Sequence, residues 1–264
     1  MFLNENKRVV IKVGSSTLTH DGGKPNLQRL EQLSRVISEL KNRGMQPVLV
    51  SSGAIAVGKG RMKISSPSDV ATKQALAAIG QSDLIGIYDR FFSEYGYAAA
   101  QILINRDVIL NDERRKNVIN TFEKLIELDA VPIVNENDSV STEEILFGDN
   151  DNLSAIVAEL ASAKTLIILT DIDGYYSEDP RKNKKAKKID KVFDITEDMI
   201  NNAGGSGSSV GTGGMKTKLE AARYAQTKGI STVIMSGQNP TDIYKLFEGK
   251  NIGTIFVGED NGNN

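Results

Sequence analysis

The chain alternates short apolar runs with longer stretches in which apolar residues recur every three or four positions. Short runs that are apolar on both faces are typical of buried parallel strands, and the periodic stretches are typical of amphipathic helices. In 26–44, Leu30, Leu33 and Ile37 share one helical face, and Gly44 ends the helix. The expected strands are 8–13, 47–50, 98–104, 131–134, 165–169, 232–235 and 253–257. The expected helices are 26–44, 69–95, 117–128, 152–162, 215–226 and 242–247. The alternation predicts an α/β fold with a mostly parallel sheet.

Two clusters of short amides and carboxylates flank one loop in the middle of the chain. The apolar run 131–134 stops at the sequence Asn-Glu-Asn-Asp of 135–138, and the sequence Gly-Asp-Asn-Asp-Asn of 148–152 follows the loop. Such side chains suit recognition of a small polar molecule, or of a cation beside it. They also favour turns and helix caps, because they bond to nearby backbone groups. Both interpretations remain open for either cluster alone, and the pairing of the two favours a binding site.

Two further stretches suit a phosphate group. Lys12 interrupts a strand that is otherwise apolar, and Gly14 and Ser15 follow it with backbone N–H groups and a hydroxyl. The alternative is a lysine at the end of a strand that reaches solvent. The glycine-rich stretch 203–214 runs into the helix at 215–226, and the beginning of a helix attracts anions. Alone, this stretch is equally well explained as a surface loop.

Lysines and carboxylates together predict phosphoryl transfer, in which catalysis consists mainly of positioning and charge neutralisation. Lys12 and Lys218 would hold the transferring group, and the nearby carboxylates are those of Asp138, Asp149, Asp151 and Asp171. The stretch 53–60 nearly matches a P-loop, but position 60 is glycine where a Mg²⁺-binding hydroxyl is needed. We therefore expect Gly53 and Gly58 to serve close packing or a turn.

Composition excludes several other kinds of site. The 264 residues contain no cysteine and one histidine, His20, so thiolate, histidine-zinc and Ser-His-Asp chemistry is not expected. The formal charge is −2, and the one basic run, 181–188, has no interleaved aromatic residues. A solvated loop is the first interpretation of that run, and attraction of an anion is the second. We expect no nucleic acid or membrane partner and a cytoplasmic location.

The stretches described above resemble the amino acid kinase family. The segments that carry the resemblance are VVIKVGSS (9–16), VSSGAI (50–55), NEND (135–138), FGDNDNLSA (147–155), LTDIDGYY (169–176) and GTGGMKTKL (211–219). The pairing of NEND with FGDND is similar to the members that phosphorylate the side-chain carboxylate of glutamate in proline synthesis. The resemblance implies a three-layer αβα sandwich with a mostly parallel central sheet, like that of carbamate kinase.

The resemblance also implies roles for individual residues. The catalytic residues would be Lys12, Lys218 and Asp151. The glutamate-binding residues would be Ser52, Asn135, Asp138, Asp149 and Asn150. The ATP-binding residues would be Lys12, Gly14, Ser15, Thr170, Asp171, Thr212, Gly213, Gly214, Met215, Lys216, Thr217 and Lys218. ATP is the co-substrate, and Mg²⁺ would arrive bound to ATP, with no metal ligand assigned to the protein.

The whole chain, 1–264, is expected to form a single amino acid kinase domain. Residues 1–162 would bind glutamate, 163–258 would bind ATP, and 259–264 would be a disordered tail. Many family members carry a further C-terminal PUA domain, which we do not expect in a chain that ends soon after Gly258. Proline would be a feedback inhibitor, glutamyl phosphate reductase the next enzyme, and the protein a homo-oligomer. The alternatives are a kinase of the same family that acts on aspartate or acetylglutamate, and a nucleotide-binding sensor without catalysis.

Overall fold

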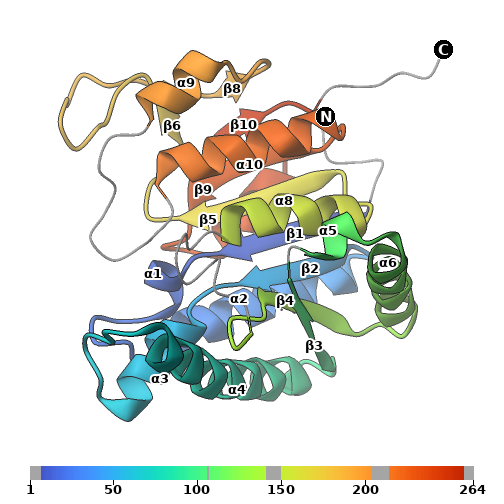
Figure 1. Cartoon of the computed structure of the whole chain (residues 1–264). Coiled ribbons are helices and arrows are strands. Elements are labelled where there is room, and N and C mark those ends of the chain that lie inside the picture. Colours follow the sequence, from blue (N-terminus) through green and yellow to red (C-terminus); the bar gives the residue numbers. More distant parts are fainter. Residues whose placement is uncertain (1–6, 106, 141–149, 204–213, 259–264) are drawn as a thin grey trace.

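A computed structural model describes residues 7–105, 107–140, 150–203 and 214–258. Its centre is an eight-stranded sheet with the strand order β3-β4-β2-β1-β5-β9-β10-β8 (Figure 1). The strands are β1 (Arg8–Val13), β2 (Gln46–Ser51), β3 (Ala99–Ile104), β4 (Val131–Glu136), β5 (Thr165–Thr170), β8 (Lys191–Val192), β9 (Ser231–Ser236) and β10 (Thr254–Phe256). All neighbouring pairs are parallel except β9 and β10. The expected mostly parallel sheet is therefore confirmed.

Helices cover both faces of this sheet, as expected for a three-layer αβα sandwich. The helices α6 (Asp112–Glu127), α8 (Asn150–Leu160) and α10 (Met215–Thr227) pack on one face. The helices α2 (Leu27–Asn42), α4 (Val70–Glu94) and α11 (Asp242–Phe247) pack on the other. Figure 1 shows α8 and α10 in front of the sheet and α2 behind it. Strand residues alternate between the two cores: Val10 contributes to the α8 side, and Val9 and Ile11 contribute to the α2 side.

The short elements were the ones that periodicity did not reveal. These are α1 (Ser15–Leu18), α3 (Ala54–Met62), α5 (Asp107–Leu110), α9 (Glu197–Asn202), the strand β8 and the small antiparallel pair β6 (Tyr175–Tyr176) and β7 (Lys188–Ile189). Helix α6 begins earlier than expected, because the Asn111 side chain caps it by accepting from the Arg114 N–H. Strand β4 was predicted to stop before Asn135. That boundary is wrong, since the strand continues through Glu136.

The solvated loop that was the first interpretation of the basic run agrees with the structure. The run at 181–188 lies mainly in an exposed loop that ends at β7, and His20 is exposed as well. Within the described ranges, no helix combines the length and apolar character required to cross a membrane.

Strand order determines where polar side chains can meet. The chain passes from β1 to β2 and outward to β3 and β4, then returns to β5 on the other side of β1. The strands β2, β3 and β4 therefore lie on one side of β1, and the strands that follow in the chain lie on the other. In open α/β sheets, ligands bind at such a switch point, beyond the carboxyl ends of the strands. At this edge lie the residues that follow β1, β2, β4 and β5, which include Gly14, Ser52, Asp138 and Asp171.

Helices α3 and α4 touch through glycines. A Cβ on Gly58 would collide with the backbone of Leu76, and a Cβ on Gly80 would collide with the carbonyl oxygen of Ala54. Gly53 precedes α3 with φ of 104°, a conformation that few other residues tolerate. The stretch 53–60 is therefore a turn followed by a closely packed helix. This agrees with the expectation that Gly53 and Gly58 serve close packing or a turn. The contact fixes α4 against the turn that carries Ser52.

Replacing two glycines of α4 separately should have opposite effects on stability. Gly80→Ala should lower the free energy of unfolding by about 2 kcal/mol or more, because α3 and α4 must separate. Gly86→Ala should raise it by about 0.5–1 kcal/mol, because open space surrounds Gly86 and alanine favours the helix. Urea unfolding followed by circular dichroism measures both. Equal effects of the two changes would contradict the close helix contact.

Candidate active site

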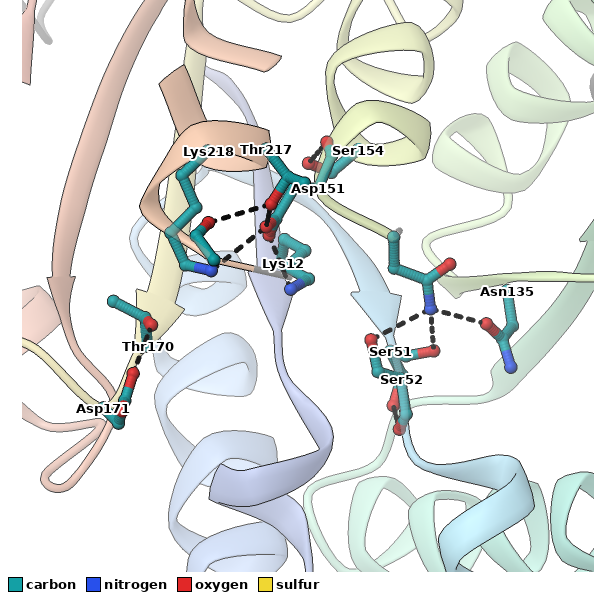
Figure 2. A network of polar contacts seen from close by, with 12 residues as sticks. Lys12, Ser51, Ser52, Asn135, Asp151, Ser154, Thr170, Asp171, Thr217 and Lys218 are labelled. Atoms are coloured by element: carbon teal, nitrogen blue, oxygen red, sulfur yellow. Dashed lines mark hydrogen bonds and ion pairs between the residues drawn. The ribbon is translucent and has the colours of Figure 1, made fainter. Parts of the chain in front are cut away.

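Three charged side chains meet beneath the switch point. The Asp151 carboxylate contacts Lys12 Nζ at 2.6 Å through Oδ1 and Lys218 Nζ at 3.1 Å through Oδ2 (Figure 2). All three are buried, with exposed fractions of 0% for Asp151, 6% for Lys12 and 5% for Lys218. The structure thus brings together the three residues that were predicted as catalytic, and the alternative of a Lys12 that reaches solvent is wrong.

The fold explains this convergence from three distant positions. Alternation along β1 places Lys12 on the same face as Val10, toward α8 and α10. Asp151 lies in the first turn of α8, where the helix dipole favours a negative charge. Lys218 lies in the first turns of α10, which packs beside α8. We call Lys12, Asp151 and Lys218 the charged triad.

The charged triad carries one more positive than negative charge in a buried position. Burial alone would raise the pKa of Asp151, but Lys12 and then Lys218 outweigh that effect and hold it well below the usual range. Asp151 therefore remains ionised at neutral pH and compensates only part of the lysine charge. A remaining positive charge away from water interacts strongly with an anion. The triad thus suits a negatively charged ligand.

Thr217 adds a contact to Asp151 that the sequence did not reveal. Its hydroxyl lies 2.9 Å from Asp151 Oδ2 and 2.9 Å from the Gly214 carbonyl oxygen, so it can donate to either. Thr217 was predicted only as part of the ATP-binding segment. Its role beside Asp151 depends on how α10 packs against α8, which no sequence pattern specifies.

A second group of polar side chains surrounds Asn150, the first residue of α8. The Asn150 side chain donates from Nδ2 to Ser52 Oγ at 2.9 Å and to Asn135 Oδ1 at 2.9 Å. Asn135 in turn donates from Nδ2 to Gln81 Oε1 at 2.9 Å. We call Ser52, Asn150, Asn135 and Gln81 the amide chain. Because Asn150 and Asp151 are adjacent residues, the beginning of α8 joins the amide chain to the charged triad.

A cavity of about 280 Å³ opens beside the amide chain. Its wall includes Gln81 from α4, Asn135 from β4 and Asp138 from the loop that follows β4. Asp138 is buried, with an exposed fraction of 7%. The cavity therefore combines amide side chains with the carboxylates of Asp138 and Glu136, and it suits a small polar molecule that carries a positive group.

The residues predicted for the nucleotide lie on the opposite side of the triad. In Figure 2 the triad stands between Thr170 and Asp171 on one side and Ser52 and Asn135 on the other. The Thr170 hydroxyl donates to Asp171 Oδ1 at 3.0 Å. Gly14 precedes α1 beside Lys12, since a Cβ there would lie 3.8 Å from Lys12 Nζ. Ser15 begins α1, and Gly214 and Met215 begin α10.

Some predicted residues do not join this arrangement. Lys216 is half exposed, and the ion pair that it forms among the described residues is with Glu220 at 4.0 Å, not with Asp151. Asp149, Thr212 and Gly213 lie outside the described residues, as does most of the glycine-rich stretch 203–214. In the described parts of the chain, no three acidic or histidine side chains gather as a metal site would require.

Gln81 and Tyr88 are the residues near the site that sequence reasoning missed. Tyr88 is fully buried, and its hydroxyl lies 3.0 Å from Ser51 Oγ. Seven positions separate Gln81 from Tyr88, so both lie on one face of α4, and both touch residues at the carboxyl ends of strands. The sequence marks α4 as a helix with small residues but does not say which strands its polar face meets.

Known proteins show similarity along nearly the whole chain. The model of the amino acid kinase family matches residues 7–236. A protein of Clostridium perfringens named glutamate 5-kinase is 50% identical, and the alignment covers 97% of each chain. Another with this name, from Enterococcus faecalis, is 45% identical over 97% of this chain and 96% of its own. A third, from Caldanaerobacter subterraneus, is 46% identical, but the alignment covers only 68% of that longer protein.

Solved structures share the fold at much lower identity. The UMP kinase of Bacillus anthracis has a TM-score of 0.65 at 16% identity, covering 96% of both chains. The isopentenyl phosphate kinase of T. acidophilum has a TM-score of 0.62 at 16% identity, covering 94% of this chain and 99% of its own. With the family model spanning most of the described residues and close relatives along almost the full length, the chain belongs to the amino acid kinase family.

Proposed function

We propose that the chain transfers the γ-phosphoryl group of ATP to the side-chain carboxylate of L-glutamate, the first step of proline synthesis. The products are L-glutamyl 5-phosphate and ADP. The observation that carries the proposal is the buried, positively charged triad joined through α8 to a cavity for a small polar molecule. Relatives named glutamate 5-kinase, at 45–50% identity over 97% of the chain, support the choice of acceptor.

The reaction needs positioning and charge neutralisation more than proton transfer. A glutamate carboxylate is ionised at neutral pH, so it can attack without a general base. One of its oxygens forms a bond to the γ-phosphorus, and the bond from that phosphorus to the bridging oxygen breaks. ADP leaves with the electron pair. Lys12 and Lys218 neutralise charge on the transferring group, which supplies most of the catalysis in such reactions.

Asp151 holds the two lysines in place for this step. Its two oxygens contact one ammonium each, which sets the positions of Lys12 and Lys218 on opposite sides of one carboxylate. The hydroxyl of Thr217 supports Asp151 Oδ2. Because Asp151 keeps its negative charge, it also limits the repulsion between the lysines before the anion arrives.

The two sides of the triad take the two substrates. Glutamate binds in the first portion of the chain, to Ser52, Asn135, Asp138, Asp149 and Asn150. ATP binds in the second portion and at the end of β1, to Gly14, Ser15, Thr170, Asp171 and the segment 212–218. Mg²⁺ would arrive bound to ATP, and no metal ligand is assigned to the protein. When bound, it neutralises phosphate charge.

Further parts of the proposal concern the protein in the cell. It is a cytoplasmic homo-oligomer that forms one kinase domain. Proline inhibits it as the end product, and glutamyl phosphate reductase takes its product. A kinase for aspartate or acetylglutamate is the nearest rival, and a nucleotide sensor without catalysis is the rival from another class.

An ADP-release assay distinguishes these possibilities. ADP formation should depend on L-glutamate, and aspartate and N-acetylglutamate should each give kcat/KM at least about 100-fold lower, because the cavity's polar groups lose partners. Added proline should reduce the rate. Equal or greater activity with another acid would assign the chain to a rival kinase, and nucleotide binding without ADP release would assign it to the sensor class.

Replacement of Lys218 tests its role in the transferring step. Lys218→Ala should lower kcat by about 10²–10³, as loss of one electrostatic donor does, and Lys12→Ala should act similarly. Lys245→Ala is a matched control, since Lys245 is half exposed on α11 and contacts only Asp242 among the ion pairs of the described residues. Steady-state ADP release measures all three. A Lys218→Ala enzyme with unchanged kcat would remove that lysine from the mechanism.

Replacement of Asp151 should lower stability in a pH-dependent way. In Asp151→Asn two buried ammonium groups lose their counter-charge, so the free energy of unfolding should fall by about 3–5 kcal/mol at pH 7. Because the folded pKa of Asp151 lies below its unfolded value, its contribution is complete above the unfolded pKa of about 3.9. The difference from wild type should then shrink by up to about 1.4 kcal/mol per pH unit as pH falls further.

Urea unfolding of both proteins at pH 7 and pH 3 provides the measurement. A stability difference that stays constant between these pH values would contradict a depressed pKa at Asp151.

A further inference from the structure

The amide chain determines which atom of Asn150 is left for a ligand. Nδ2 of Asn150 is already engaged, because it donates to Ser52 Oγ and to Asn135 Oδ1 at 2.9 Å each. Oδ1 of Asn150 is buried and has no hydrogen-bond partner among the described residues. Asn150 itself has an exposed fraction of only 6%. A buried acceptor without a donor is costly, and Asn150 lies one hydrogen bond from Asn135 in the cavity wall, so a ligand group that donates would be stabilised there.

The order of the amides starts at Gln81, whose side chain presents its oxygen to Asn135. An amide side chain has a donor end and an acceptor end, and Asn135 could present either one to Asn150. Gln81 Oε1 accepts from Asn135 Nδ2 at 2.9 Å, which leaves Asn135 Oδ1 to face Asn150. Asn150 must then use its Nδ2 toward Asn135, and its Oδ1 remains. With the Gln81 oxygen facing Asn135, the acceptor at Asn150 follows from the orientation of a side chain on helix α4.

The position of Gln81 is itself fixed by packing. Its neighbour Gly80 lies against the carbonyl of Ala54, and Tyr88, two turns further along α4, is fully buried with its hydroxyl 3.0 Å from Ser51 Oγ. Both contacts join α4 to the turn that carries Ser52. Gln81 thus reaches Asn135 from a rigid helix, as a group that orients another side chain should.

We infer that Gln81 is a positioning residue that makes the site select an acceptor substrate with a free α-ammonium group. The inference rests on the proposed function. At neutral pH both carboxylates of glutamate can only accept hydrogen bonds, and its ammonium is its only donor. An acceptor fixed at Asn150 Oδ1 therefore matches the ammonium and no other part of the molecule. A dicarboxylate without an amino group leaves this acceptor unsatisfied.

The test compares Gln81→Met, which removes the acceptor, with Gln81→Glu, which keeps one. Methionine has similar length and helix propensity, so α4 should remain folded. Gln81→Met should raise KM for glutamate about tenfold, as loss of an oriented bond to a charged group does, with kcat and KM for ATP nearly unchanged. Gln81→Glu should lie much closer to wild type, because its carboxylate still accepts from Asn135.

Glutarate, which lacks the amino group, serves as the comparison substrate. If Gln81 only supported the fold, its replacement would affect glutamate and glutarate equally. The ratio of kcat/KM for glutamate to that for glutarate should fall about tenfold in Gln81→Met and stay near the wild-type value in Gln81→Glu. Gln74→Met is the matched control: it makes the same change on the same helix, outside the residues that line the cavity. It should leave the ratio unchanged.

The outcomes separate this inference from the proposed function. An unchanged KM in Gln81→Met, or a raised KM with an unchanged glutamate-to-glutarate ratio, would overturn the role of Gln81 while the glutamate kinase assignment stood. A wild-type protein without glutamate-dependent ADP release would reject the proposed function, and the inference with it.

Discussion

One buried carboxylate between two buried ammonium groups is the interaction on which the rest of the site depends. Asp151 joins Lys12 from β1 and Lys218 from α10, and it does so from the first turn of α8. Charges this deeply buried are tolerated only when they are paired, so the three elements must meet in one arrangement. The cost of that burial is offset only in part by Asp151. Under the proposed function, the positive charge that remains on the triad prepares the site for a transferring phosphoryl group.

Helix α8 connects this chemistry to recognition. Asn150 belongs to the amide chain and Asp151 belongs to the charged triad, so a single peptide bond links the two groups. Any shift of the first turn of α8 moves both. Helix α4 sets the other boundary, because its glycine contact with α3, its buried Tyr88 and its Gln81 all bear on the ends of β2 and β4. The cavity proposed for the acceptor is therefore bordered by α4 and by the end of β4, and the packing of these elements sets the positions of its polar side chains.

Much of this could be predicted from the sequence, and the limits have physical reasons. Long periodic stretches predicted the helices, and short apolar runs predicted the buried strands. Lys12 could be singled out because a charged residue interrupts an apolar strand. Short elements such as β6 and α9 have too few residues for a period to be visible. Asn135 resembled a turn residue, yet strand pairing with β3 extends β4 beyond it. Gln81 and the Thr217 contact depend on which elements pack together, and local sequence does not encode that.

The central claim is that Lys12 and Lys218 receive the transferring phosphoryl group at the beginning of α8. The most direct measurement is a crystal structure with Mg²⁺, ADP, L-glutamate and a planar metal fluoride in place of that group. The account predicts the fluoride between the β-phosphate and the glutamate side chain, with both lysine Nζ atoms within hydrogen-bond distance of it and still in contact with Asp151. A fluoride bound away from the triad, or a triad that separates when the ligands bind, would contradict the account.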